Sequence, residues 1–218
     1  MKIAHKVFMS LAGCSLLVLQ PAIATPINVT GMGFPSPTTV HINSVTPPTA
    51  EYVYAGGFST TVGANSLLTW CVDILKNTYF NNSYNDAQLV DAASISYIGQ
   101  QRAAALARLA TESLGLVNNS LTSGAFQLAA WEIVYENPNN TYNLGTGNFT
   151  AFGASDGAIT LANTWLSNLP STSDYTVSVF LSPTRQNLAI FTQVPEPSSL
   201  VLLGMGLLGL GLARRKKV

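Results

Sequence analysis

Apolar and polar positions alternate along several short stretches of this chain, and the alternation predicts strands on both sides of its middle part. These stretches are rich in aromatic and β-branched residues and are bounded by Gly, Asn or Pro, which is typical of strands. Strands are predicted over 52–58, 67–74, 175–181 and 188–194. A further strand is expected near 39–45, within an N-terminal segment rich in Pro and Thr.

Four segments between these strands have the composition and spacing of helices. Apolar residues recur at Leu106, Leu109 and Ala110, as on one face of a helix. Helices are predicted over 86–98, 101–114, 123–135 and 156–169. The order of strands, helices and strands predicts an α+β domain. Its terminal strands are expected to form one sheet or a small barrel, with a central block of about four helices.

The first residues of the chain have the pattern of a secretory signal peptide. A basic start precedes a mostly apolar run over 7–19, and a small-residue A-x-A site follows it. Cleavage is expected between Ala24 and Thr25. The sequence before Cys14 also resembles a lipoprotein modification site, although the apolar stretch that precedes it is short.

The segment 194–218 contains three physically different parts in a fixed order. A rigid Pro195-Glu196-Pro197 is followed by an apolar run over 200–213, which is shorter than the about 20 residues that span a bilayer. The run is therefore expected to enter the inner membrane only transiently. We expect its end to be held on the cytoplasmic side by a cluster of four cations, Arg214, Arg215, Lys216 and Lys217.

This order of parts resembles the PEP-CTERM sorting signal of Gram-negative bacteria that make extracellular polysaccharide. The resemblance implies that an exosortase, a membrane-embedded cysteine transpeptidase, removes the tail during export. The protein is then expected at the cell surface or outside the cell. The chain is accordingly divided into a signal peptide (1–24), an extracellular domain (25–193) and a sorting signal (194–218).

The two targeting segments account for the apparent neutrality of the chain. Between them, four cationic and nine acidic side chains leave a net charge of about −5. Nucleic acid is not an expected partner, because its binding requires a basic surface. No cofactor, metal or conventional catalytic motif is found, so none of these functions is expected and the protein is not expected to be an enzyme. A carboxylate cluster for calcium or a glycan remains an alternative, formed by Asp73, Asp86 and Asp91.

Cys71 is the single cysteine between the targeting segments. This is unusual for an exported domain, because oxidising compartments favour paired cysteines. In a strand over 67–74, Trp70 lies on the apolar face, and Cys71 and Asp73 lie on the opposite one. The thiol is therefore expected to point away from the main core. A buried and inert cysteine is the alternative.

Gln127 lies among residues that face inward in the third predicted helix. Ala130 and Trp131 share its face at helical spacing, and a buried amide needs hydrogen-bond partners. Gln127 is expected in the first helical turn, where free N–H groups can polarise a carbonyl. The solvent side of the helix is expected to carry Glu132 and Tyr135.

Two short segments resemble the paired signatures of bacterial thioester domains, which are found at the tips of surface adhesins and pili. The segments are Trp70-Cys71-Val72-Asp73 and Gln127-Leu128-Ala129-Ala130-Trp131-Glu132. In that family the Cys thiol attacks the Gln carboxamide, expels ammonia and leaves a thioester, which an amine of a target molecule then opens. The resemblance implies a bond between Cys71 and Gln127, in an environment formed by Trp70, Asp73, Ala130 and Trp131.

The same resemblance implies a covalent adhesin whose partner is an amine-bearing surface molecule or extracellular polysaccharide. Two positions depart from the family pattern, because Phe126 replaces a Thr or Ser and Ala130 replaces a larger aliphatic residue. The first change removes a hydroxyl that could assist proton transfer, so the departures concern thioester formation more than the fold. The alternative function is a non-covalent structural component of the exopolysaccharide or biofilm matrix, with an inert Cys71.

Overall fold

The computed structural model describes residues 24–154 and 157–195, and the segments 1–23 and 196–218 lie outside the described residues. The strands are β1 (Ile27–Met32), β2 (Thr38–Ser44), β3 (Thr49–Ala55), β4 (Phe58–Val62), β5 (Asn65–Cys71), β6 (Asn82–Tyr84), β7 (Gln88–Asp91), β8 (Phe149–Phe152), β9 (Tyr175–Leu181) and β10 (Leu188–Gln193). The helices are α1 (Gly99–Ser113), α2 (Ser120–Tyr135) and α3 (Ala158–Ser167). Short 3-10 turns lie at Ala92–Ser94 and Leu114–Leu116.

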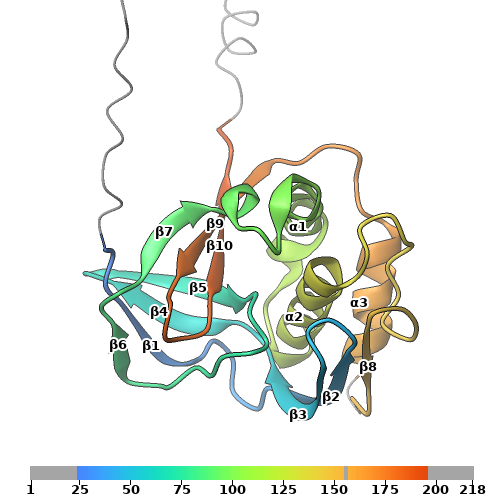
Figure 1. Ribbon diagram of the computed structural model, residues 1–218, viewed down its shortest axis with the longest axis horizontal. Coiled ribbons are helices and arrows are strands. Elements are labelled where there is room, and N and C mark those ends of the chain that lie inside the picture. The colour runs from blue at the N-terminus through green and yellow to red at the C-terminus, as the bar shows by residue number, and fades with distance from the viewer. Residues whose placement is uncertain (1–23, 155–156, 196–218) are drawn as a thin grey trace, which may run out of the picture.

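The strands form two antiparallel sheets, and Figure 1 shows the helices gathered on one side of the larger sheet. The larger sheet has the strand order β6-β1-β4-β5-β10-β9-β7, and the smaller one has the order β3-β2-β8. The larger sheet curls so that its two ends meet. Ala24, just before β1 near one end of the sheet, forms a β-bridge with Gln88 of β7, the edge strand at the other end. The N–H of Thr25 also donates to the Ala87 carbonyl at 2.6 Å.

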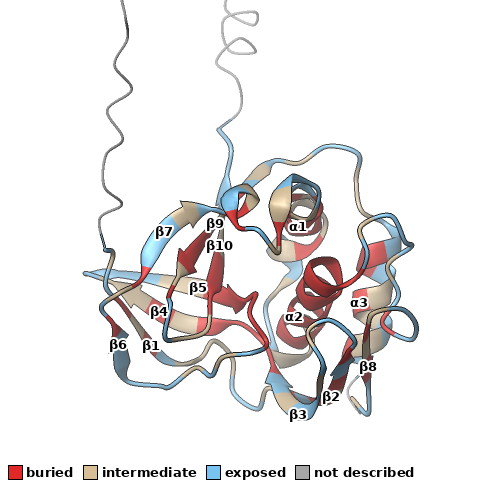
Figure 2. Cartoon of the chain, in the orientation of Figure 1, coloured by how far each residue is buried: buried red, intermediate tan, exposed pale blue. Residues whose placement is uncertain are grey.

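Helix α2 fills the space between the two sheets. It begins in a capping box, in which Asn119 and Thr122 each bond the other's backbone N–H. Almost every residue of α2 is buried, as Figure 2 shows, and a helix that is apolar on all sides belongs in a core. Phe126 packs on Trp70 of the larger sheet with ring centroids 4.3 Å apart. Tyr135 stacks on Phe149 of the smaller sheet at 6.1 Å.

Gly124 lets α2 lie directly against strand β2. A Cβ atom at this position would lie 2.6 Å from the Cβ of Thr38, far inside van der Waals contact. Ser123, the preceding residue, is buried at the same crossing. The contact fixes the height of α2 above the smaller sheet and so sets where the following turns of the helix meet β5.

The predicted α+β fold with a central block of about four helices is wrong. The described residues form ten strands and only three α-helices, so the fold is mostly β. The segment 86–98 contains β7 and a 3-10 turn instead of a helix, because Gln88 to Asp91 pair with β9, and strand pairing overrides a weak local preference. The strands β1, β4, β6, β7 and β8 were not predicted.

The other predicted elements correspond to observed ones. The strand predicted over 175–181 is β9 with the same bounds, and the helices predicted over 101–114, 123–135 and 156–169 are α1, α2 and α3 with shifted ends. Within the described parts of the chain, no helix has the length and apolar character needed to cross a membrane.

Candidate functional site

Strands β4 and β5 separate at the point where helix α2 reaches the larger sheet. Their pairing ends at Phe58 and Thr69. The backbone groups just before Phe58 and just after Thr69 therefore need other hydrogen-bond partners. Side chains of α2 supply these partners at two positions one helical turn apart. The Ser123 hydroxyl accepts from the Gly57 N–H at 2.9 Å, and Gln127 binds the backbone of Cys71.

The Gln127 carboxamide takes the place of a missing strand beside Cys71. Its Oε1 accepts from the Cys71 N–H at 2.9 Å, and its Nε2 donates to the Cys71 carbonyl at 2.8 Å. Cys71 and Gln127 are 1 % and 0 % exposed. The two residues, 56 positions apart in the chain, are therefore held side by side through both polar atoms of the carboxamide.

Two expectations about this pair are wrong. Gln127 does not lie in the first helical turn, because α2 begins at Ser120, and the N–H that reaches its carbonyl comes from Cys71 rather than from the start of the helix. Cys71 does not point away from the core, because α2 covers this side of β5 and the thiol is buried with the rest of the strand end.

A pocket of about 300 Å³ leads to the pair, with Cys71, Gln127 and Trp131 among its lining residues. Trp131 follows Gln127 by one helical turn and is 3 % exposed. A larger hollow of about 690 Å³ borders Asp73 and Lys76 but includes neither Cys71 nor Gln127. The smaller pocket is therefore the one by which another molecule would approach the thiol.

Burial raises the pKa of the Cys71 thiol to about 12. The indole Nε1 of Trp131 lacks an acceptor at full hydrogen-bond geometry, yet its proximity to the sulfur partly lowers the thiol pKa. The thiol donates to the Asp73 carbonyl oxygen at 3.3 Å. Cys71 is therefore a protonated thiol at neutral pH, and its proton must leave in any step that uses the sulfur as a nucleophile.

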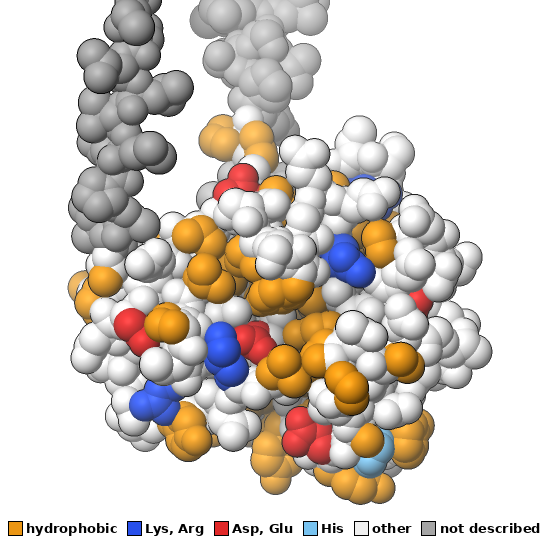
Figure 3. Space-filling view, viewed as in Figure 1, with side chains coloured by type: hydrophobic (Ala, Val, Ile, Leu, Met, Phe, Trp, Pro, Cys, Tyr) orange, Lys and Arg blue, Asp and Glu red, His pale blue; other side chains and the backbone are white. Residues whose placement is uncertain are grey.

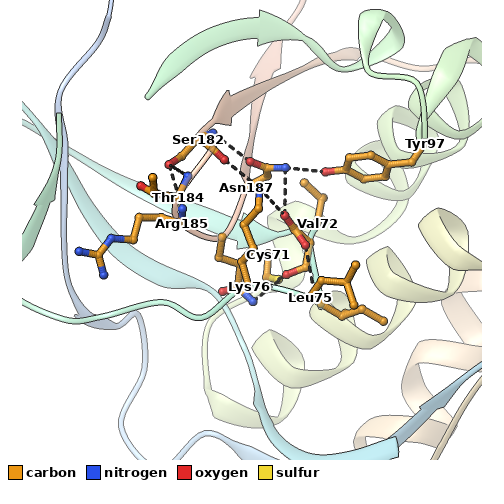
Figure 4. A network of polar contacts seen from close by, with 12 residues as sticks. Cys71, Val72, Leu75, Lys76, Tyr97, Ser182, Thr184, Arg185 and Asn187 are labelled. Atoms are coloured by element: carbon orange, nitrogen blue, oxygen red, sulfur yellow. Dashed lines mark hydrogen bonds and ion pairs between the residues drawn. The ribbon is translucent and has the colours of Figure 1, made fainter. Parts of the chain in front are cut away.

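Asp73 anchors the chain that follows β5 to the turn between β9 and β10. Its carboxylate forms an ion pair with Lys76 at 3.1 Å and accepts from Asn187 Nδ2 at 3.2 Å. Asn187 also donates to the Tyr97 hydroxyl at 3.0 Å, and Figure 4 shows Asn187 at the centre of these contacts. Lys76 Nζ donates further to the Ser182 carbonyl at 2.9 Å. The carboxylate raises the Cys71 pKa, but this effect is smaller than that of burial.

The other residues expected around the thioester have different positions. Trp70 is buried against Phe126 and is absent from the lining of the Cys71 pocket. Ala130 is fully buried within α2 and is likewise absent from that lining. The structure thus brings Cys71, Gln127 and Trp131 together and leaves Trp70 and Ala130 in the surrounding core.

Glu132 and Tyr135 are buried, so their expected place on the solvent side is wrong. The Tyr135 hydroxyl donates to the Val72 carbonyl at 3.1 Å and accepts from the Ile74 N–H at 2.9 Å. Glu132 Oε1 accepts from the Asn143 N–H at 2.7 Å, whereas its Oε2 has no partner. Tyr135 therefore fixes the chain beyond Cys71, and Glu132 fixes the loop before β8.

Glu132→Gln is expected to flatten the pH dependence of stability. Burial raises the Glu132 pKa from 4.5 to about 8, so between these values the folded state holds a proton that the unfolded state lacks. The free energy of unfolding of the wild type should then fall as pH rises, by up to about 1.4 kcal/mol per pH unit. The variant cannot titrate, and urea unfolding at pH 5 and pH 8 should show the smaller change.

Glu136→Gln is the matched control for this experiment. Glu136 lies one turn further along the chain, and hydrogen bonds from the backbone and from Asn140 outweigh the effect of burial and lower its pKa. Its contribution to stability is therefore present above its unfolded pKa and is lost as pH falls. Equal pH dependence in the wild type and in Glu132→Gln would contradict the raised pKa.

The carboxylates of the alternative calcium or glycan cluster are engaged separately. Asp86 accepts from the hydroxyls of Ser182 and Thr184, and Asp91 caps a 3-10 turn. Within residues 24–154 and 157–195, no group of three His, Cys, Asp or Glu side chains could hold a metal ion.

Glu51 and Lys76 also line the Cys71 pocket, and the sequence interpretation did not include them. Glu51 could have been found, because the alternation of β3 places it on the same face as Val53, where an acidic residue among apolar ones is unusual. Lys76 carried no such signal, since its approach to Asp73 depends on the turn that follows β5.

Comparison with known proteins identifies the targeting part of the chain. Residues 193–217 match the PEP-CTERM protein-sorting motif, of which only 193–195 are among the described residues. No curated protein and no solved structure matches the chain, and the comparisons lend no support to the resemblance to thioester domains. The signal peptide and its cleavage after Ala24 stay predictions. The chain thus carries a PEP-CTERM signal, which implies export, transient C-terminal membrane anchoring, processing by an exosortase and a final place at the cell surface or outside the cell.

Proposed function

We propose that the exported domain is a covalent adhesin that forms an internal thioester between the Cys71 thiol and the Gln127 carboxamide. The observation that carries the proposal is the pair of hydrogen bonds at 2.9 and 2.8 Å between the Gln127 carboxamide and the Cys71 backbone. They hold the electrophile beside the residue whose thiol would attack it. Such preorganisation replaces a costly encounter of two separate groups.

Each atom of the carboxamide has a role in the proposed reaction. The Cys71 sulfur forms a bond to the Gln127 carbonyl carbon, the C–N bond breaks, and ammonia leaves with the thiol proton. As the carbon becomes tetrahedral, negative charge develops on Oε1, which the Cys71 N–H already contacts. An N–H aimed at a developing oxyanion stabilises the transition state.

Trp131 would determine how long the thioester lasts. Its indole is buried and lines the pocket that leads to Cys71. An amine and water compete for the same carbonyl carbon, so a side chain that restricts water near the bond favours reaction with the amine. The opening reaction joins the amine nitrogen to the Gln127 carbonyl carbon and returns the Cys71 thiol.

Methylamine treatment tests this function in the exported protein. The wild type is expected to gain one methylamine on Gln127, located by peptide mass spectrometry, and Cys71→Ala is expected to gain none. An unmodified Gln127 with an alkylatable thiol in the unfolded chain would contradict the proposal and favour an inert cysteine in a matrix component. A protein whose mass is lower by one ammonia but which does not react with methylamine would also contradict the proposal. It would indicate a permanent amide between Gln127 and a neighbouring amine such as Lys76.

A further inference from the structure

The pocket that leads to Cys71 is lined by both apolar and neutral polar side chains and carries two charged residues at its rim. The apolar residues include Ile42, Val53, Phe58 and Trp131, the neutral polar ones include Gln127 and Gln186, and the charged ones are Glu51 and Lys76. Acidic and basic groups are few on the face shown in Figure 3, and most of them are separated by apolar and neutral side chains. The two rim charges therefore dominate the electrostatic field at the entrance.

Glu51 faces the pocket because of the register of the smaller sheet. It is paired with Ile42, and Val53 is paired with Val40. Since paired residues share a face of a sheet, Glu51 lies on the same inner face as buried Ile42. Strand β3 is an edge strand, so this glutamate remains exposed at the border of the sheet.

Lys76 does not cancel the charge of Glu51. Its ammonium is engaged by the Asp73 carboxylate at 3.1 Å and by the Ser182 carbonyl at 2.9 Å. No ion pair or side-chain hydrogen bond of Glu51 is found among the described residues. The entrance thus carries one paired cation and one uncompensated carboxylate.

We infer that Glu51 is the specificity-determining residue of the pocket and selects primary amines that approach as ammonium groups and carry no nearby negative charge. This inference rests on the proposed thioester. The carboxylate attracts the ammonium to the rim of the pocket.

The reaction that follows is balanced without a further reagent. The ammonium first loses one proton to water, and the neutral nitrogen attacks the thioester carbonyl carbon. The C–S bond breaks, and the second proton of the nitrogen passes to the Cys71 sulfur. An amide at Gln127 and a free thiol are the products.

The test compares two amines of similar length, 1,5-diaminopentane and 6-aminohexanoate, which differ in the charge at the far end. Counted per amino group, the wild type should react faster with the diamine, by about tenfold at low salt, and added salt should reduce the difference. In Glu51→Gln the ratio of the two rates per amino group should approach one. Glu112→Gln, an acid outside this pocket, should keep the wild-type ratio.

The two proposals fail in distinguishable ways. A wild-type ratio in Glu51→Gln, with the thioester present, would overturn the role of Glu51 and leave the thioester standing. A wild type that forms no thioester would overturn both. Two additional nucleophiles distinguish the possible sources of the ammonium: Nα-acetyl-lysine amide stands for a protein and glucosamine for a polysaccharide. The nucleophile whose rate falls in Glu51→Gln identifies the class of the natural target.

Discussion

Trp131→Ala is expected to lower the free energy of unfolding by about 3–5 kcal/mol, because it replaces a buried indole with a cavity. Trp131 is 3 % exposed and lies near Phe149, with ring centroids 6.4 Å apart. The same change should expose the proposed thioester to water, so the fraction of protein that reacts with methylamine should fall. Urea unfolding measures the first effect and adduct mass measures the second.

Trp165→Ala is the matched control for this variant. Trp165 is 4 % exposed and lies in α3, outside the lining of the Cys71 pocket. Trp165→Ala should lower the free energy of unfolding by a similar amount, but the folded variant should still react with methylamine. If both variants lost the reaction equally, Trp131 would have no shielding role beyond its contribution to the core.

Gln127→Ala is expected to lower the free energy of unfolding by about 2–6 kcal/mol. The Cys71 N–H and carbonyl would both lose their buried partner, and an unsatisfied buried group costs about 1–3 kcal/mol. The variant should also be unreactive towards methylamine. The loss of the carboxamide thus removes the structural link and the proposed electrophile together.

Cys71→Ala separates these two effects. It keeps the backbone groups that Gln127 binds and removes only the sulfur, so its loss of stability should be about 1 kcal/mol. Both variants abolish the proposed thioester, which removes any contribution of the covalent bond from the comparison. Equal unfolding free energies for the two variants would show that the carboxamide does not hold the end of β5.

The sequence marks Cys71 and Gln127 as unusual separately, one as a lone cysteine after an aromatic residue and the other as a glutamine on an inward helix face. That the two lie together was expected only from the resemblance of their segments to thioester domains. Their hydrogen bonds were not predictable, since these depend on the separation of β4 from β5 beyond Phe58. Sequence periodicity carries no information on where two strands part.

The fold class was wrong for a related reason. Gln88 to Asp91 have a composition compatible with a helix, and only pairing with β9 makes them a strand. Strands such as β6 and β8 have three and four residues, which is too few for a clear alternation. Glu132 was placed on the surface because helix α2 was treated as having a solvent side, whereas two sheets and two helices surround it.

The intact mass of the exported protein, measured before any added amine, tests the central claim most directly. The thioester predicts a mass lower by one ammonia than the sequence of the processed chain requires. Cys71→Ala and Gln127→Ala should show the full masses of their sequences. A wild-type mass equal to that of its sequence would contradict the thioester and leave Gln127 as a structural partner of the Cys71 backbone alone.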